Sequence, residues 1–328
     1  MKNKLSLGII LLIFMMTAIT FSLGNMMYNF NLKKTEQNVI GVELADFIYN
    51  INYSMQFGKK IETFYGMEEQ LYSVAESFQD IQDLYIISEE NQILFATEKA
   101  VPDNDICTMI AGENKIAGQY LYCMYQLSKN ATILVKSSSR NIKIQLIAHM
   151  KKLLRIALAG MAAVMILTVL FWKILKNKNT AFRVSFILLL VWILLFGGWI
   201  GFEGYQVYCT SLDTVFETIR YSIRSDFNQI AALGVPENRI FEIEQYLLRY
   251  TDMIPEVEQI QVHQEEIVCI PSSAYRQKII LDYSLQTVLL LTFSVLILTE
   301  YRLFIFIQSK QLLEPRTAQE RMMQNGES

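Results

Sequence analysis

Apolar residues along this chain gather into four uncharged blocks, each close to the length of a membrane-crossing helix. The blocks are Leu5–Leu23, Ile156–Trp172, Val184–Phe202 and Ser284–Thr299. A helix needs about 20 apolar residues to cross the hydrocarbon core of a bilayer, and inside lipid it satisfies its own backbone hydrogen bonds. We therefore predict four transmembrane helices, the last being the weakest because charged residues interrupt its apolar continuation.

Charged residues beside the blocks predict the side of the membrane on which each connection lies. Lys and Arg concentrate in cytoplasmic connections. Three segments show this concentration: the N-terminus with Lys2 and Lys4, the link with Lys173, Lys176, Lys178 and Arg183, and the tail with Arg302, Lys310, Arg316 and Arg321. The two long segments contain more acidic than basic residues and are expected outside the cytoplasm. Lys151, Lys152 and Arg155 are an exception, since they lie at the outer end of the second block.

This orientation divides the chain into eight segments. We expect transmembrane helices at residues 1–24, 151–176, 184–203 and 284–307, extracytoplasmic domains at 25–150 and 204–283, a cytoplasmic link at 177–183 and a cytoplasmic tail at 308–328. The protein is then a multi-pass protein of the inner or plasma membrane, with both large loops extracytoplasmic. A cleaved signal peptide is the alternative for the first block, but its apolar run exceeds the usual 7–15 residues and no A-x-A-like site follows.

The two outer segments repeat one pattern. Aligned without a gap, Leu71 falls on Leu247 and Ile86 on Val262, and the same offset brings the first and third apolar blocks nearly into register. Amphipathic helices share apolar spacing by chance, whereas an equal distance from a membrane segment favours an internal duplication. A folded unit that follows a membrane helix twice favours sensing or binding at a surface over soluble catalysis.

Each outer segment is predicted to combine helices with antiparallel strands, so the fold class is an α+β membrane protein. The first segment is expected to contain helices at 40–55 and 67–78 and two hairpins, formed by 83–87 with 92–96 and by 119–127 with 131–135. The second is expected to contain helices at 212–230 and 240–254 and strands at 259–262, 265–270 and 278–281. Its sheet is truncated, so an edge would need cover from the first segment or from another chain.

The residues after the first long helix resemble the Cache-type sensor domains of bacterial receptors, which are PAS-like sheets inserted between two membrane helices. The resemblance rests on Phe57-Gly58, Met67–Phe78 and Asp80–Ala96, with Leu233-Gly234 and Pro255–Ile270 in the second copy. It implies an extracytoplasmic sensor. Cache receptors usually carry an output module after the last membrane helix, whereas only a short tail follows here. A partner protein, or a downstream module of a longer protein of which this chain is a fragment, would then supply the output.

No motif for phosphate binding, metal hydrolysis, redox or serine catalysis is present in the sequence. We therefore expect no enzyme activity, no cofactor and no metal. The even number of cysteines allows the disulfides Cys107–Cys123 and Cys209–Cys269 in an oxidising compartment. Four buried thiols are the alternative, which we favour because the spacing matches no disulfide framework.

Five residues on the predicted strands are candidate contacts for a small ligand: Asp83, Tyr85, Tyr120, Tyr122 and Tyr125. Aromatic rings with a few aimed polar groups are typical of small-molecule pockets, and Asp83 is placed to meet an amine. The alternative is that tyrosine occurs here because strands favour it.

Small residues recur in two of the membrane blocks. Ala159 and Ala163 are spaced four apart in the second block, as are Gly197 and Gly201 in the third. Such spacing permits close approach of membrane helices, so these residues are candidates for packing between the two blocks or for a homodimer.

Two functions fit these patterns. The first is a receptor that binds an extracytoplasmic small molecule or protein and passes the signal through its membrane helices to a cytoplasmic or membrane output partner. The second is an accessory or scaffold subunit whose outer domains bind a partner protein, which the truncated second sheet favours. In both cases the lipid bilayer is a partner and nucleic acid is not.

Overall fold

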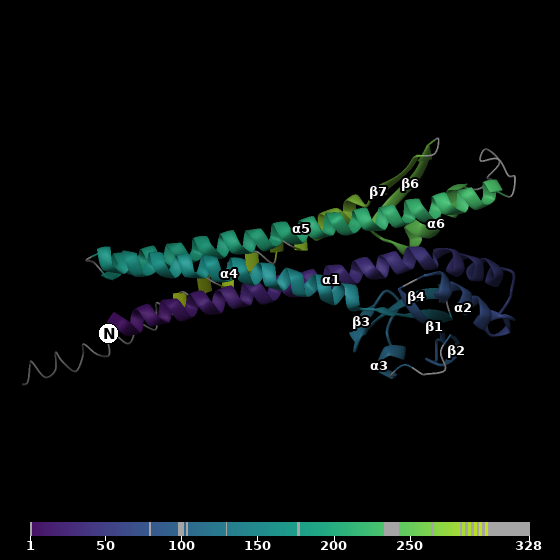
Figure 1. Ribbon diagram of the computed structural model, residues 1–328, viewed down its shortest axis with the longest axis horizontal. Helices are drawn as coiled ribbons and strands as arrows, with labels where there is room; N and C mark the ends of the chain where they lie inside the picture. The colour runs from purple at the N-terminus through teal and green to yellow at the C-terminus, as the bar shows by residue number, and fades with distance from the viewer. Residues whose placement is uncertain are drawn as a thin grey trace, which may run out of the picture. The chain divides into compact units, whose positions relative to one another are not determined.

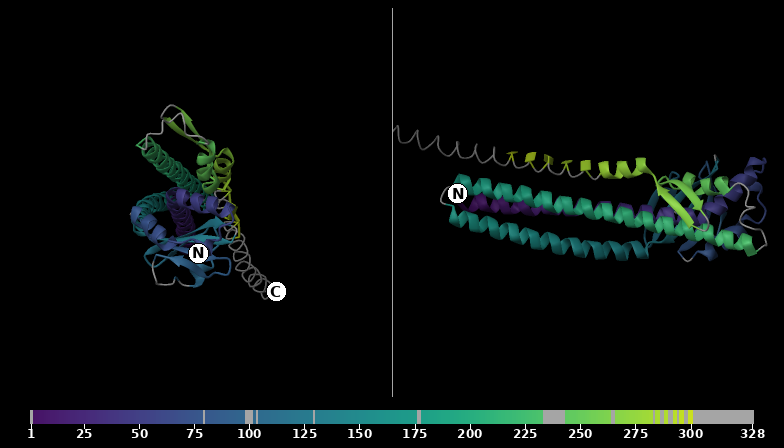
Figure 2. Two further views of the ribbon diagram at one scale, coloured as in Figure 1. Left: turned by 90° about the vertical axis from the view of Figure 1, so that its right-hand side faces the viewer. Right: turned by 90° about the horizontal axis from the view of Figure 1, so that it is seen from above.

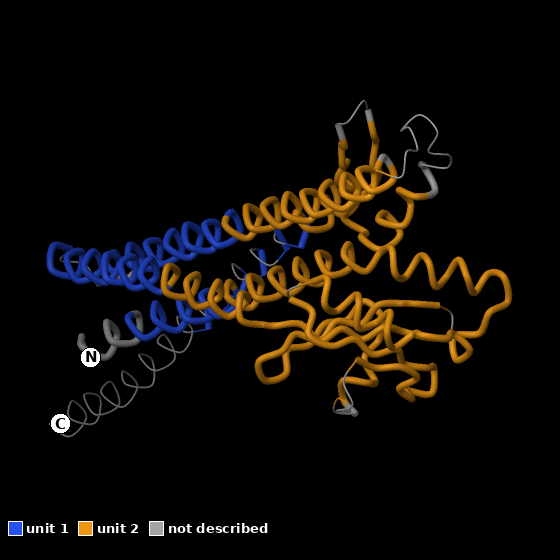
Figure 3. Tube along the Cα trace, turned by 45° about the vertical axis from the view of Figure 1, so that its right-hand side comes forward, with its two compact units in different colours: residues 1–23, 154–202, 281–328 blue, residues 24–153, 203–280 orange. Residues whose placement is uncertain are grey.

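The computed structural model describes residues 2–78, 80–97, 102, 104–128, 130–175, 178–232, 243–263 and 266–282, with isolated residues between 284 and 300. Two compact units are present (Figure 3): unit 1 contains residues 1–23, 154–202 and 281–328, and unit 2 contains residues 24–153 and 203–280. The fold is mixed α+β, as predicted.

Three helices in the described part of the chain are long and apolar enough to cross a membrane. They are α1 (Lys2–Gln56), α4 (Arg140–Ile174) and α5 (Lys178–Ala232), and each carries one of the first three predicted blocks. The predicted fourth helix at 284–307 lies largely outside the described residues.

The membrane-length portions of these helices pack on one another in unit 1 (Figures 1 and 2). Their core is apolar and includes Ile13, Met16 and Ile193. At Gly160 of α4 there is no space for a side chain, because an added Cβ would overlap the ring of Trp192. The indole N–H of Trp192 donates to Thr17 Oγ1 over 3.0 Å. Gly160 therefore leaves the space that the Trp192 ring occupies between the helices.

The predicted small residues occupy other positions in unit 1. Ala159 and Ala163 lie on the exposed face of α4, and Gly197 has no atom within 4 Å of an added Cβ. Gly201 is half-buried. Gly160 and Trp192 make one contact between the second and third blocks, and a role of the predicted small residues in helix packing or in a homodimer stays a prediction.

The first part of unit 2, residues 24–153, is called the sheet subdomain. Its five antiparallel strands have the order β2-β1-β5-β4-β3. The strands are β1 (Ile81–Ser88), β2 (Ile93–Ala96), β3 (Asn114–Ala117), β4 (Tyr120–Ser128) and β5 (Ala131–Ser138). Both predicted hairpins are confirmed. Strand β3 and the short helix α3 (Asn104–Cys107) were not predicted.

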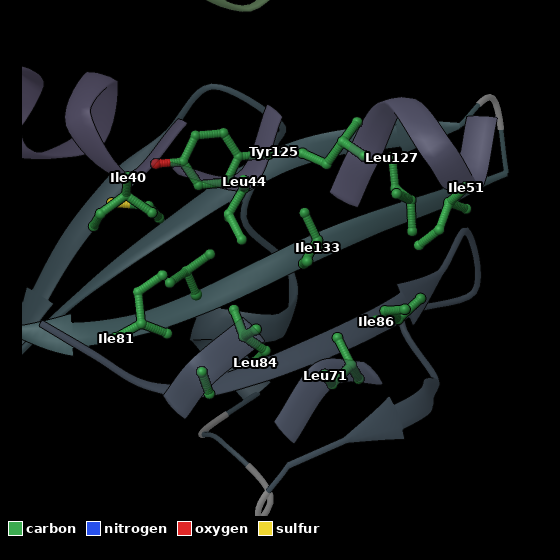
Figure 4. Packing of buried hydrophobic residues seen from close by; sticks show 14 of the residues in the cluster. Ile40, Leu44, Ile51, Leu71, Ile81, Leu84, Ile86, Tyr125, Leu127 and Ile133 are labelled. Atoms are coloured by element: carbon green, nitrogen blue, oxygen red, sulfur yellow. The ribbon is translucent and has the colours of Figure 1, made fainter. Parts of the chain in front are cut away.

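Helix α1 and the short helix α2 (Met67–Ser77) contribute to one core of the sheet subdomain. Figure 4 shows Ile40, Leu44 and Ile51 of α1 together with Tyr125 and Ile133 of the strands. The three α1 residues recur at intervals of four and seven, which places them on one helix face. Burial of this apolar face against the sheet stabilises the subdomain.

The second part of unit 2, residues 203–280, is called the hairpin subdomain. It consists of the end of α5, helix α6 (Ile243–Met253) and the strands β6 (Val257–His263) and β7 (Glu266–Pro271). The predicted strand at 278–281 is wrong, since these residues are helical. Tyr275 and Ile279, one helical turn apart, pack on the core of this subdomain, and that burial favours the helix.

Helix α1 is shared by two cores. Val42 and Ala45 are buried against α5, α6 and β6, on a different side of α1 from Leu44. Between the two sides, an added Cβ at Gly41 would lie 3.3 Å from Tyr125 Cε1 and 3.9 Å from Met253 Cε. The first long helix therefore contributes to the apolar core of the hairpin subdomain, whereas cover for the edge of its sheet stays a prediction.

The two halves of the chain repeat the order of their elements, and their corresponding helices have equal lengths. Helices α1 and α5 contain 55 residues each, and α2 and α6 contain 11 residues each. The elements also begin at one constant spacing, at Lys2, Met67 and Ile81 in the first half and at Lys178, Ile243 and Val257 in the second. This regularity agrees with the repeat seen in the sequence.

Candidate functional site

A groove of about 650 Å³ lies beside α1 in the sheet subdomain of unit 2. One wall is formed by the stretch of α1 from Met26 to Gln37, and the other by residues 105–115, from α3 to β3. Small-molecule sites in proteins have volumes of about 300–1,000 Å³. The groove is therefore large enough for a metabolite.

Local hydrogen bonds fix the wall opposite α1. The Ile110 N–H donates to Glu113 Oε2 over 3.0 Å, which closes the turn before β3. Gly112 in this turn has a φ of 90°, a conformation that glycine adopts at little cost. The Asn114 side-chain amide donates to Gln37 Oε1 over 2.9 Å and ties the strand to α1. The two walls are thus joined at the base of the groove.

Charged side chains of both signs line the groove. Lys33, Lys34 and Lys115 supply ammonium groups, and Asp105 and Glu113 supply carboxylates. Three lysines against two carboxylates give the lining more positive than negative groups. This arrangement suits a polar molecule that carries a negative group.

The five ligand contacts predicted from sequence do not gather at this groove. Asp83 forms an ion pair of 2.7 Å with Lys136, and the Lys136 ammonium lies 4.7 Å from the centre of the Tyr120 ring. The predicted partner of Asp83, an amine, is thus present within the chain itself.

The other three tyrosines lie on opposite faces of the sheet. Tyr85 and Tyr122 are buried in a core that includes α3, whereas Tyr125 faces α1. The Tyr125 hydroxyl donates to the backbone carbonyl of Gln37. Gln37 lines the groove, so Tyr125 supports one wall of the groove from behind.

Two carboxyls on α1 are poised to titrate near neutral pH. Burial, followed by the Asp80 carboxylate, raises the pKa of Glu36 to about 7. The same causes, with a further contribution from Glu36, raise the pKa of Glu43 to about 7. The sheet subdomain therefore contains buried acid groups whose charge changes in the neutral pH range.

The cysteines are thiols. All four are free in the structure, with Cys107, Cys123 and Cys269 buried and Cys209 half-buried. Burial raises the pKa of Cys123 to about 12 and that of Cys269 to about 11. These two thiols are therefore unreactive at neutral pH.

A second, smaller cavity of about 30 Å³ lies next to the groove, between α1, α5 and the residue before β6. Glu256 and Tyr208 line it, and both are buried. A Glu256 oxygen lies 4.0 Å from Lys34 Nζ. Burial, then the Glu256 charge, raises the pKa of Tyr208 to about 12.

Other charged contacts hold the two subdomains together. Arg249 of α6 pairs with Asp46 of α1 and with Asp226 of α5, the latter over 2.9 Å. Lys152, whose charge was unexpected at the outer end of the second block, pairs with Glu203.

No family model, curated protein or solved structure matches the chain. Among the described residues, no group of three His, Cys, Asp or Glu side chains is placed to hold a metal ion.

Sequence reasoning missed the groove because its walls come from distant segments. Lys33 and Lys34 follow the first apolar block, where lysines are typical of the flank of a membrane helix. Residues 105–115 show no periodic pattern of apolar positions. The turn signal of Gly112 was the only local indication of this wall.

Proposed function

We propose that the chain is a membrane receptor whose sheet subdomain binds a small molecule in the groove beside α1. The apolar blocks would cross the membrane with both subdomains of unit 2 outside the cytoplasm. The observation that carries the proposal is that the groove lies on α1, the same continuous helix that bears the first apolar block. The resemblance of Asp80–Ala96 to Cache sensors supports the same function.

The signal would travel along α1. A ligand that contacts both walls of the groove favours one position of α1 relative to residues 105–115, and such small helix shifts are a common output of receptors. The output partner would be a separate cytoplasmic or membrane protein. The ligand shifts the equilibrium between two positions of α1 only by the difference between its binding free energies for these two positions.

The test is thermal unfolding of the full-length protein in detergent against a panel of anionic, cationic and neutral metabolites. A ligand at about a hundred times its Kd adds about 2.7 kcal/mol of stability. We expect at least one compound to raise the Tm, and the double variant Lys33→Gln/Lys115→Gln to reduce the effect. Lys60→Gln, which is exposed and outside the groove, is the matched control.

An accessory subunit remains the second candidate, and one observation favours it. The described part of the hairpin subdomain has a sheet of only two strands, β6 and β7. An unpaired strand edge can accept a strand from a partner protein. A panel without any hit, together with co-purification of a partner that is lost when a proline is placed in β7, would favour this function over a receptor.

A further inference from the structure

Lys34 stands between the groove and the small cavity. It lines both hollows, together with Phe30 from the preceding turn of α1. Its side chain is 26% exposed, so the ammonium is accessible from solvent. A lysine has four rotatable bonds and a compact charge, and it changes partners with little rearrangement of the backbone. The Lys34 ammonium can therefore pair with a negative group in the groove or with one beside the small cavity.

On one side, Glu256 holds Lys34 only loosely. The distance of 4.0 Å between Lys34 Nζ and Glu256 Oε1 is at the outer limit for an ion pair. The other oxygen, Oε2, is buried without a hydrogen-bond partner, as is the Tyr208 hydroxyl. The cavity beside them has room for about one water molecule, which could solvate the carboxylate. The pair is thus not locked by a network of hydrogen bonds.

On the other side, the groove offers two further ammonium groups. Lys33 and Lys115 line it from opposite walls. A negatively charged ligand between them would present its charge to Lys34 as well. A charge-assisted contact at hydrogen-bond distance is stronger than an ion pair at 4.0 Å.

We propose that the groove binds a small organic anion, and that the anion competes with Glu256 for Lys34. This inference rests on the proposed receptor function and names its ligand class and its first conformational step. Lys34 belongs to α1, and Glu256 directly precedes β6 of the hairpin subdomain. Occupation of the groove therefore releases one tie between α1 and the hairpin subdomain. By linkage, the factor by which the bound anion weakens the Lys34–Glu256 pair equals the factor by which loss of this pair raises the affinity for the anion.

The test measures binding of citrate and of succinate to the full-length protein in detergent by calorimetry, against sodium chloride of equal ionic strength. We expect Glu256→Gln to bind the anion at least 5-fold more tightly than the unmodified protein. Lys34→Gln should bind at least 10-fold more weakly. In the Lys34→Gln background, Glu256→Gln should change nothing. Glu258→Gln, at an exposed position two residues further along the chain, is the control and should bind as the unmodified protein does.

A second variant at the same position tests the proposal if Glu256→Gln does not fold. Glu256→Asp retains the charge but shortens the reach toward Lys34, and it should tighten binding about 2-fold. If anion binding depends on Lys34 and Lys115 but neither Glu256 variant changes it, Glu256 does not compete with the anion for Lys34. The proposed receptor function would still hold. If neither anion binds while a neutral or cationic metabolite raises the Tm, the ligand class is wrong. If no metabolite of any class binds, the receptor function itself fails.

Discussion

The sheet subdomain and the hairpin subdomain start alike, with a 55-residue helix, an 11-residue helix and a hairpin, and then differ in how each core is closed. The sheet subdomain adds three strands and covers its core with its own helices. The hairpin subdomain has two described strands and buries its apolar residues against Val42 and Ala45 of α1. One helix thus completes two cores, so the smaller subdomain depends on the larger one.

The chain offers separate optical signals for testing this dependence. All three tryptophans (172, 192 and 199) lie in unit 1, whereas most tyrosines lie in unit 2. Near-ultraviolet circular dichroism of tyrosine therefore follows unit 2, and tryptophan fluorescence follows unit 1. Urea titration of the full-length protein in detergent gives the free energy of unfolding for each signal.

The largest effect is expected from Leu44→Ala. Leu44 is fully buried in the core of the sheet subdomain, and truncation of a buried leucine costs about 4 kcal/mol through lost transfer energy and the cavity left behind. Both subdomains should lose protection in hydrogen exchange, because both need α1. Val42→Ala is the matched change on the other side of α1 and should cost about 1.5 kcal/mol, with exchange raised mainly in α6 and β6. Equal loss in both subdomains for Val42→Ala would contradict the one-way dependence.

The next effect concerns the ionic tie between the subdomains. Arg249→Ala removes the cation shared by Asp46 and Asp226, which leaves two partly buried carboxylates close together. We expect a loss of about 3 kcal/mol in the tyrosine signal, discounted from the range for fully buried pairs because Asp46 is half exposed. Arg224→Ala, on an exposed position of α5, should change stability by less than about 0.5 kcal/mol. Similar values for the two variants would mean that apolar contacts alone join the subdomains.

A smaller effect compares one tyrosine hydroxyl in each core. The Tyr250 hydroxyl lies 2.9 Å from Ser222 Oγ and accepts from Arg249 over 3.0 Å, so Tyr250→Phe should cost about 2 kcal/mol. The Tyr125 hydroxyl donates to the Gln37 carbonyl and has the Cys123 thiol as a second partner. Both partners are uncharged, so Tyr125→Phe should cost about 1 kcal/mol. The same urea titration measures both. A larger loss for Tyr125→Phe would show that the polar contacts are more important in the sheet core.

The smallest effect is a pH dependence confined to the sheet subdomain. Glu36 and Glu43 have pKa values of about 7 in the folded protein, raised mainly by burial and then by Asp80. The folded state therefore binds protons more tightly than the unfolded state between about pH 4.5 and 7. Stability from these groups is fully present below the unfolded pKa and is lost as the pH rises through 7.

We expect the Tm of unit 2 to be higher at pH 5.5 than at pH 8, by on the order of 3 °C. Asp80 faces both carboxyls, and burial raises the pKa values of the nearby Cys123 and Tyr125 to above this range. His149 in the same unit has a pKa lowered by burial, which acts in the opposite direction. The double variant Glu36→Gln/Glu43→Gln should flatten the profile. A slope that persists in this variant would assign the pH dependence to other groups.

The elements of both subdomains could be predicted in large part from local pattern. Apolar spacing identified the long helices, and alternation with turn residues identified the hairpins of β1 with β2 and of β4 with β5. The strand predicted at 278–281 failed because Ile279 and Ile280 fit either period over four residues, and the helical contacts of Tyr275 and Ile279 decided the outcome.

The groove beside α1 could not be predicted from local sequence pattern, because it depends on which distant segments contact one another. The sequence by itself determined the apolar blocks, the charge of their flanks and the repeated order of elements, since each is a property of neighbouring residues. Only the tertiary structure placed residues 105–115 opposite Lys33 and Lys34, paired Asp83 with Lys136, and set Lys34 beside Glu256. These contacts join residues that are far apart along the chain, and burial of apolar surface around α1, rather than any local preference, selects them.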